Sequence, residues 1–144
     1  MKLHEYQAKQ LFAAVGIPVP RGRLAQTPEE AASAYTALRQ ECGAADRAFT
    51  CNVKAQLHAG GRGKAGGVLV ATSTEEAKRH ATGLLGRRLV THQTGPQGLP
   101  VSAVLLDERL EVAQELYLAV TLDRFSATPV ALASRRGGVD IEEV

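Results

Sequence analysis

The spacing of apolar residues along the chain predicts three helices, each with one apolar face. Apolar side chains recur three or four positions apart near the N-terminus and again after Thr27 and after Ser73, a spacing that places them on one side of a helix. Thr27 and Ser73 each stand three residues before a glutamate, which is typical of helix starts because the two side chains satisfy free backbone amides. Glycines at positions 16, 43 and 86 are expected to end the helices. The apolar positions are Leu3, Tyr6, Leu11, Phe12 and Val15 in the first helix, Ala31, Ala34, Tyr35 and Leu38 in the second, and Ala77, Ala81, Leu84 and Leu85 in the third.

Apolar and alternating runs between the helices predict strands. Residues 49–56 alternate apolar and polar side chains, as a half-buried strand does. The order of helices and strands predicts an α/β (α+β) fold in which helices cover one face of a mixed, partly antiparallel sheet. The expected strands cover residues 23–25, 49–56, 68–70, 101–106, 115–122 and 129–133, the last two as a hairpin around Ser126.

The composition fits one ordinary globular domain and excludes several classes of protein. Of the 144 residues, 44% are apolar and 22% are charged, which suffices to bury a core. The net charge is only +2 and aromatic residues make up 4% with no Trp, which argues against nucleic acid as a partner. No apolar run approaches the roughly 18 residues that cross a bilayer, so no membrane partner is expected. Cys42 and Cys51 are too few for a disulfide framework or a zinc site and fit a reducing compartment.

Residues 60–67 form a glycine-rich loop between two expected strands. Gly61, Gly63 and Gly66 match the pattern G-x-G-x-x-G, but a strand rather than a helix follows, which excludes the dinucleotide-binding form. Lys64 is followed by alanine rather than Ser or Thr, which excludes a Walker A loop. A glycine loop between two strands is the form that folds over nucleotide phosphates in protein kinases.

Positive charge beside this loop makes it a candidate anion-binding site. Without Cβ atoms, a glycine backbone can bring its N–H groups close to phosphate oxygens. Arg62 and Lys64 add positive charge within the loop, and Lys54 on the preceding strand could reach an α- or β-phosphate. The alternative is a solvated basic loop that binds no ligand.

The four histidines, at positions 4, 58, 80 and 92, offer no metal-binding pair, because none stands four residues from another. We expect surface or hydrogen-bonded side chains at these positions, with His58 of most interest because it flanks the glycine loop. The acidic end of the chain, with Asp140, Glu142 and Glu143, is expected to be a solvated segment.

Four ordered segments resemble the β subunit of succinyl-CoA synthetase (succinate–CoA ligase) and together span the chain. They are LHEYQAKQLF at residues 3–12, HAGGRGKAGG at 58–67, AQELYL at 113–118 followed by Asp123 and Arg124, and GGVDIEEV at 137–144. The resemblance implies the N-terminal portion of an ATP-grasp fold, in which two α/β subdomains clamp a nucleotide under the glycine-rich lid loop. It assigns residues 1–20 to a leading helix on the larger subdomain, 21–107 to the smaller subdomain and 108–144 to the start of the larger one.

The resemblance also implies a set of nucleotide-binding residues. Carried over position by position, it implies that Lys54, Gly61, Arg62 and Gly63 bind the phosphates. It places Asp107 and the backbone of Leu110 at the hinge that binds the base, and Glu115 at the ribose hydroxyls. A carboxylate suits that last task because it accepts two hydrogen bonds. The family usually has Glu where this chain has Asp107, whose side chain is one methylene shorter.

The activity implied by the resemblance is the formation of succinyl-CoA from succinate and CoA with ATP or GTP hydrolysis, a step of the citric acid cycle. The phosphate is carried by a histidine of the partner α subunit. The Mg²⁺ ligands are expected beyond Val144, so the chain is expected to be truncated and inactive alone. The implied location is the bacterial cytoplasm, or the mitochondrial matrix in a eukaryote. The alternatives are a malate–CoA ligase, a non-enzymatic nucleotide-binding or subunit-interaction module, and a weak polyanion-binding domain.

Overall fold

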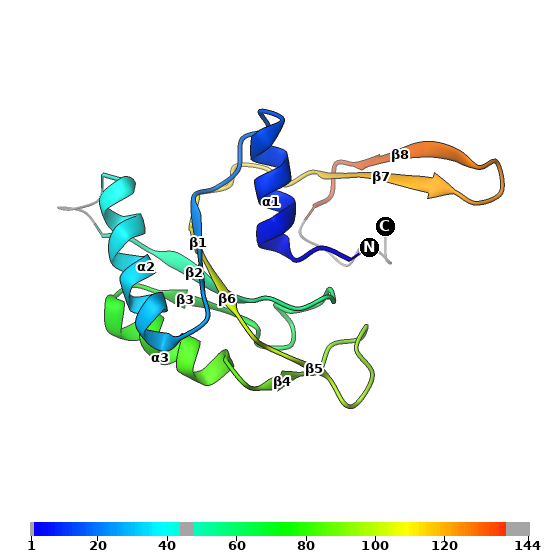
Figure 1. The fold of residues 1–144 in the computed structure, drawn as a ribbon. Coiled ribbons are helices and arrows are strands. Elements are labelled where there is room, and N and C mark those ends of the chain that lie inside the picture. The colour runs from blue at the N-terminus through cyan, green and yellow to red at the C-terminus, as the bar shows by residue number, and fades with distance from the viewer. Residues whose placement is uncertain (1, 44–47, 138–144) are drawn as a thin grey trace. The chain divides into compact units, whose positions relative to one another are not determined.

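The computed structural model describes residues 2–43 and 48–137. The chain divides into two compact units, Met1–Arg109 and Leu110–Val144, and each is described by itself (Figure 1). The expected division at residues 20 and 107 into a leading helix and two subdomains stays a prediction.

The first unit alternates helices and strands in the order that the sequence predicts, with two short strands added. Its elements are α1 (Glu5–Ala14), β1 (Gly22–Ala25), α2 (Pro28–Glu41), β2 (Cys51–Ala55), β3 (Val68–Ala71), α3 (Thr74–Leu84), β4 (Arg88–Leu89), β5 (Leu99–Pro100) and β6 (Val104–Glu108).

The main sheet has the strand order β1-β6-β2-β3. Every strand pair that the structure describes is antiparallel, whereas the sequence predicted a mixed sheet. The difference arises because β6 lies between β1 and β2 and runs opposite to both. The strands joined through α2 are therefore parallel to one another without being neighbours.

The predicted starts of the second and third helices are confirmed. The Thr27 hydroxyl accepts a hydrogen bond from the Glu30 N–H at 3.1 Å, and the Ser73 hydroxyl accepts one from the Glu76 N–H at 3.1 Å. The Glu76 carboxylate reaches back to the N–H of Thr72 at 2.9 Å and to its hydroxyl at 2.7 Å. These hydrogen bonds lower the pKa of Glu76 to about 2, and the one from the backbone N–H of Thr72 has the largest effect. Both helices thus begin where local hydrogen bonding dictates.

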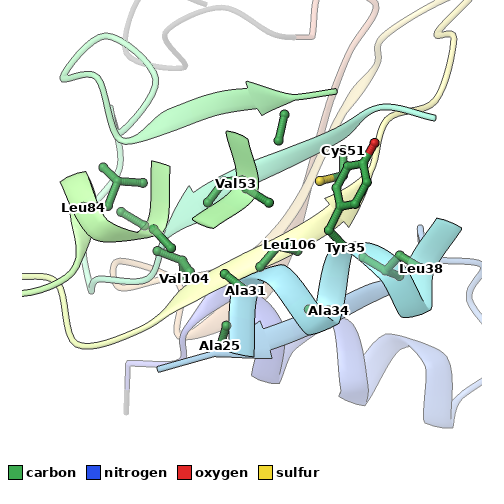
Figure 2. Close-up of a cluster of buried hydrophobic side chains, with 14 of the residues drawn as sticks. Ala25, Ala31, Ala34, Tyr35, Leu38, Cys51, Val53, Leu84, Val104 and Leu106 are labelled. Atoms are coloured by element: carbon green, nitrogen blue, oxygen red, sulfur yellow. The ribbon is translucent and has the colours of Figure 1, made fainter. Parts of the chain in front are cut away.

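The core lies between the sheet and the paired helices α2 and α3. Figure 2 shows side chains of both helices pointing toward alternate residues of the strands. Within β2 the exposure alternates, so that Cys51 and Val53 are buried under the helices while Lys54 faces the other side of the sheet. The predicted buried face of α2 is confirmed, and in α3 the described helix buries three of its four predicted positions; the buried helix residues are Ala31, Ala34, Tyr35, Leu38, Ala77, Ala81 and Leu84.

Strand β6 begins and ends later in the sequence than predicted. β6 runs from residue 104 to 108, not from 101 to 106. Val101 is buried but donates its N–H to the Arg87 carbonyl at 2.9 Å, outside the main sheet. The polar residues Asp107 and Glu108 continue the pairing with β1 and β2 beyond the apolar run. Burial and sheet pairing therefore do not coincide here, and the apolar pattern reports only burial.

Helix α1 lies against the sheet face opposite α2 and α3. Its Lys9 binds Asp107 and its Glu5 binds Lys54, and both partners project from that face. The sequence predicted that all the helices cover one face of the sheet, and this prediction is wrong because α1 lies on the other face. Leu11, Phe12 and Val15 of the predicted apolar stripe are at least half exposed.

The second unit contains the predicted hairpin, formed by β7 (Tyr117–Asp123) and β8 (Thr128–Ser134). At its turn the Asp123 carboxylate accepts hydrogen bonds from the N–H and hydroxyl of Ser126 at 3.4 and 2.7 Å. The resemblance segment after Gly137, with the acidic residues 140, 142 and 143, lies outside the described residues.

Candidate nucleotide-binding site

The structure brings two of the sequence-predicted residues, Lys54 and Asp107, together on neighbouring strands. The Lys54 ammonium donates to Asp107 Oδ2 at 2.9 Å and to Glu5 Oε1 at 3.0 Å. The other Asp107 oxygen forms an ion pair with Lys9 of α1. The Asp107 side chain is only 4% exposed, and an uncompensated charge at that depth would be costly. Asp107 is therefore held between two ammonium groups.

These contacts keep Lys54 charged. Its burial by itself would lower the pKa of Lys54, but the hydrogen bond to Asp107 and the charges of Glu5 and Asp107 outweigh burial and raise it. Lys54 is therefore a full cation at neutral pH, as phosphate binding requires.

The glycine loop forms one tight turn between β2 and β3. The N–H groups of Ala65, Gly66 and Gly67 donate to carbonyls of residues 61, 63 and 62 at 3.2, 3.1 and 2.7 Å. Gly66 has φ +74°, a left-handed conformation that glycine adopts without strain. Among the described residues, the N–H groups of 61–63 have no hydrogen-bond partner. The amides at the start of the turn are thus available to an anion.

The side chain of Arg62 folds back from the loop toward α1. One guanidinium nitrogen donates to the Ala55 carbonyl at 2.8 Å, and another donates to Glu5 Oε2 at 2.8 Å. Glu5 therefore bridges both predicted phosphate-binding cations, taking Lys54 with one oxygen and Arg62 with the other.

The turn between β4 and β5 supports the loop from another direction. The Gly60 N–H donates to Gln93 Oε1 at 2.7 Å. Gly61 has φ +73°, and a Cβ atom there would lie 2.6 Å from Nδ1 of His92. Gly61 is thus required both by its backbone conformation and by the space beside it. A Cβ atom on Gly63 would meet nothing within 4 Å.

The structure pairs two of the four histidines with each other and a third with a backbone carbonyl. The rings of His4 and His58 stack with centroids 3.9 Å apart, and His80 Nε2 lies 3.0 Å from the Val70 carbonyl. Burial, and then the nearby His58 and Arg62, lower the pKa of His4. The neutral form of His4 suits this position, because a charged ring would be repelled by the nearby positive charge of Arg62.

Two further predicted residues belong to the second unit. Leu110 and Glu115 are both exposed there, and the Glu115 carbonyl accepts the Gly137 N–H at 3.2 Å. Their roles at the base and the ribose stay predictions.

The described residues contain no group of three or more His, Cys, Asp or Glu side chains that could hold a metal ion. The two carboxylates of the site, Glu5 and Asp107, are already bound by cations. The side chains in residues 2–43 and 48–137 therefore do not fit a Mg²⁺ site of their own. Across the same ranges, no helix has the length and apolar character to cross a membrane.

The sequence did not reveal Glu5, Lys9, His92 or Gln93 as parts of the site. Glu5 stands in the first turn of a helix, where an acidic residue is ordinarily explained by the helix dipole. Its partners Lys54 and Arg62 are 49 and 57 positions away. No local pattern signals contacts at such separations.

The contacts of Glu5 predict how stability depends on pH. Burial alone would raise the pKa of Glu5, but Lys54 and Arg62 together lower it from 4.5. The stabilisation is therefore fully present above pH 4.5 and is lost as the pH falls through the lower pKa of the folded state. Urea denaturation of the wild-type chain and of Glu5→Gln should differ by a constant free energy near neutral pH. That difference should shrink in acid, and an unchanged difference down to the acid limit would contradict the ion pairs.

Comparison with known proteins places this geometry in a family. The sequence model of the protein family described as ATP-grasp domain matches residues 2–144 of this chain. The chain therefore belongs to the ATP-grasp domain family. The structure of ATP citrate lyase from Methanothrix soehngenii in complex with citrate and coenzyme A superposes with a TM-score of 0.66 at 24% identity, covering 96% of this chain and 33% of that one. This second likeness shows the fold.

Within the family, the chain is similar to the N-terminal ATP-grasp portion of succinate–CoA ligase [ADP-forming] β subunits, which confirms the resemblance drawn from its motifs. It is 50% identical to the subunit of Persephonella marina and 53% identical to that of Syntrophobacter fumaroxidans, each over 144 residues. The match covers all of this chain and 35% of each relative.

Proposed function

We propose that the chain binds the phosphates of a nucleoside triphosphate at the glycine loop, as the nucleotide-binding portion of a succinate–CoA ligase β subunit. Two observations carry this proposal. Lys54 and Arg62 converge on Glu5, and the loop amides of residues 61–63 have no partner among the described residues. Cations and free amides together favour a multiply charged anion.

Each residue has a distinct role in the proposed site. The Lys54 ammonium and the Arg62 guanidinium neutralise phosphate charge, and the amides of residues 61–63 donate hydrogen bonds to phosphate oxygens. In the second unit, the backbone of Leu110 contacts the base, and the carboxylate of Glu115 accepts hydrogen bonds from the ribose hydroxyls. We assign Asp107, with Leu110, to the hinge that binds the base, and its carboxylate also holds the Lys54 ammonium.

The proposed reaction of the whole protein extends beyond these residues. It joins succinate to CoA at the expense of ATP or GTP through a phosphohistidine on an α subunit, in the cytoplasm of a bacterium. Bound with the nucleotide, Mg²⁺ would supply further neutralisation of phosphate charge. The present chain contributes the binding and orientation of the phosphoryl group, and orientation by itself can lower a barrier substantially.

The proposal is tested by calorimetric titration of the 144-residue chain with ATP and GTP, each with and without Mg²⁺. Saturable binding of one nucleotide per chain is expected. Tripolyphosphate and heparin at two salt concentrations serve as comparison ligands. Equal, strongly salt-dependent binding of every anion would replace the proposal with a general polyanion-binding loop.

A coupled assay with ATP, CoA and succinate tests the division of labour between subunits. The purified chain alone is expected to show no turnover, because we assign the phosphorylated histidine to the α subunit. Turnover by the chain alone would contradict that assignment.

Replacing Gly63 with valine separates binding from folding. The added side chain has open space around it, so the melting temperature should stay within about 2 °C of the wild type. It would block the close approach of phosphate, and nucleotide affinity should fall about tenfold or more. Gly83→Val, at another open glycine in α3, is the matched control and should leave affinity unchanged. A large loss of stability in Gly63→Val would indicate a packing role instead.

A further inference from the structure

The carboxylate of Glu5 lies between the two cations assigned to the phosphates. Its Oε1 is 3.0 Å from the Lys54 ammonium, and its Oε2 is 2.8 Å from the Arg62 guanidinium. The three side chains are 20–23% exposed, so water screens these ion pairs less than it would surface pairs. Glu5 comes from α1, Lys54 from strand β2 and Arg62 from the glycine loop. One carboxylate thus joins three elements.

The contacts of Arg62 make this bridge relevant to the loop. Its guanidinium has two tethers, the Ala55 carbonyl at the end of β2 and Glu5 on α1. Only the second joins the loop to another part of the fold, since Ala55 belongs to the strand that leads into the loop. The position of the loop is therefore coupled to α1 through the Glu5 carboxylate.

We propose that Glu5 is a positioning residue: by holding Lys54 and Arg62 at once, it lets helix α1 set where the glycine loop and its cations stand. This role rests on the proposed phosphate-binding function and deepens it. A helix glutamate that holds a strand lysine next to a glycine loop performs the same physical task in protein kinases, where the ion pair must form before phosphate is held correctly.

Hydrogen exchange of the 144-residue chain without ligand tests the proposal directly. In Glu5→Gln the amide keeps the shape of the side chain but loses the charge that holds both cations. The amides of Ala65, Gly66 and Gly67, which are hydrogen-bonded within the loop, should exchange about tenfold faster. The amides of β2 and β6 should accelerate by no more than the loss of global stability that urea denaturation measures for the same variant. Glu29→Gln is the matched control, because Glu29 pairs with Lys78 on the exposed side of the helices and its loss should change neither set.

A second variant shows whether Glu5 acts through Arg62. In the background of Arg62→Gln, Glu5→Gln should add little further exchange in the loop, because the tether is already gone. Equal effects of Glu5→Gln in both backgrounds would overturn the proposal. So would acceleration spread evenly over β2, β6 and the loop, which would show that Glu5 only stabilises the fold, or no acceleration at all.

Nucleotide titration of the same variants separates this proposal from the proposed function. If the wild type binds nucleotide, Glu5→Gln should weaken that binding about tenfold while Glu29→Gln leaves it unchanged. If the wild type binds no nucleotide, the proposed function fails and the exchange data still decide whether Glu5 couples α1 to the loop.

Discussion

Replacing Lys54 with alanine is expected to reduce nucleotide affinity about 100-fold, the largest effect on binding of any single substitution in the site. The loss corresponds to about 2.7 kcal/mol, within the range for a charge-assisted contact to phosphate. The raised pKa of Lys54 means that the wild-type chain has the full positive charge at neutral pH. Calorimetric titration with ATP and GTP in the presence of Mg²⁺ measures the change.

The fold should survive this substitution, which makes the binding result interpretable. Without Lys54, Asp107 retains Lys9 and Glu5 retains Arg62 as counter-ions, so neither carboxylate is left alone. Lys78→Ala is the matched control, because Lys78 is an exposed lysine paired with Glu29 on the other face of the sheet. If Lys54→Ala binds nucleotide as well as the wild type, the phosphates lie elsewhere.

Much of the first unit could be predicted because its signals are local. The Thr27 and Ser73 caps act over three residues, and the buried face of α2 follows from helical spacing alone. The position of the glycine loop between two strands could likewise be predicted, and the structure confirms it because β2 and β3 pair on either side of the loop. Local hydrogen bonds and side-chain periodicity are the parts of folding that a sequence displays most directly.

The arrangement of the sheet and the completion of the site depend on contacts between distant segments. Nothing in residues 104–108 indicates that they enter between β1 and β2, and their pairing carries Asp107 to the site. Gln93 meets Gly60 across 33 positions, and Glu5 meets Arg62 across 57. The sequence therefore identified the cations and the loop, whereas the groups that hold them were visible only in the structure.

Replacing Asp107 with alanine is expected to destabilise the chain by about 3 kcal/mol, the largest effect on folding among these predictions. The substitution removes one carboxylate that binds both Lys54 and Lys9, whose side chains are only 20% and 15% exposed. Lys54 keeps Glu5, but the ammonium of Lys9 loses its ion pair with Asp107 and has no other ion pair among the described residues. Urea denaturation followed by circular dichroism measures the loss. Glu29→Ala, which breaks the exposed pair with Lys78, should cost under about 1 kcal/mol.

The cause of the loss can be separated from simple loss of packing. If unpaired charge is responsible, adding Lys54→Met and Lys9→Met to Asp107→Ala should recover most of the stability, because methionine fills a similar volume without charge. If the triple variant is no more stable than Asp107→Ala, the contribution of Asp107 is packing rather than charge compensation. An Asp107→Ala chain as stable as the wild type would show that the buried carboxylate does not hold the two lysines.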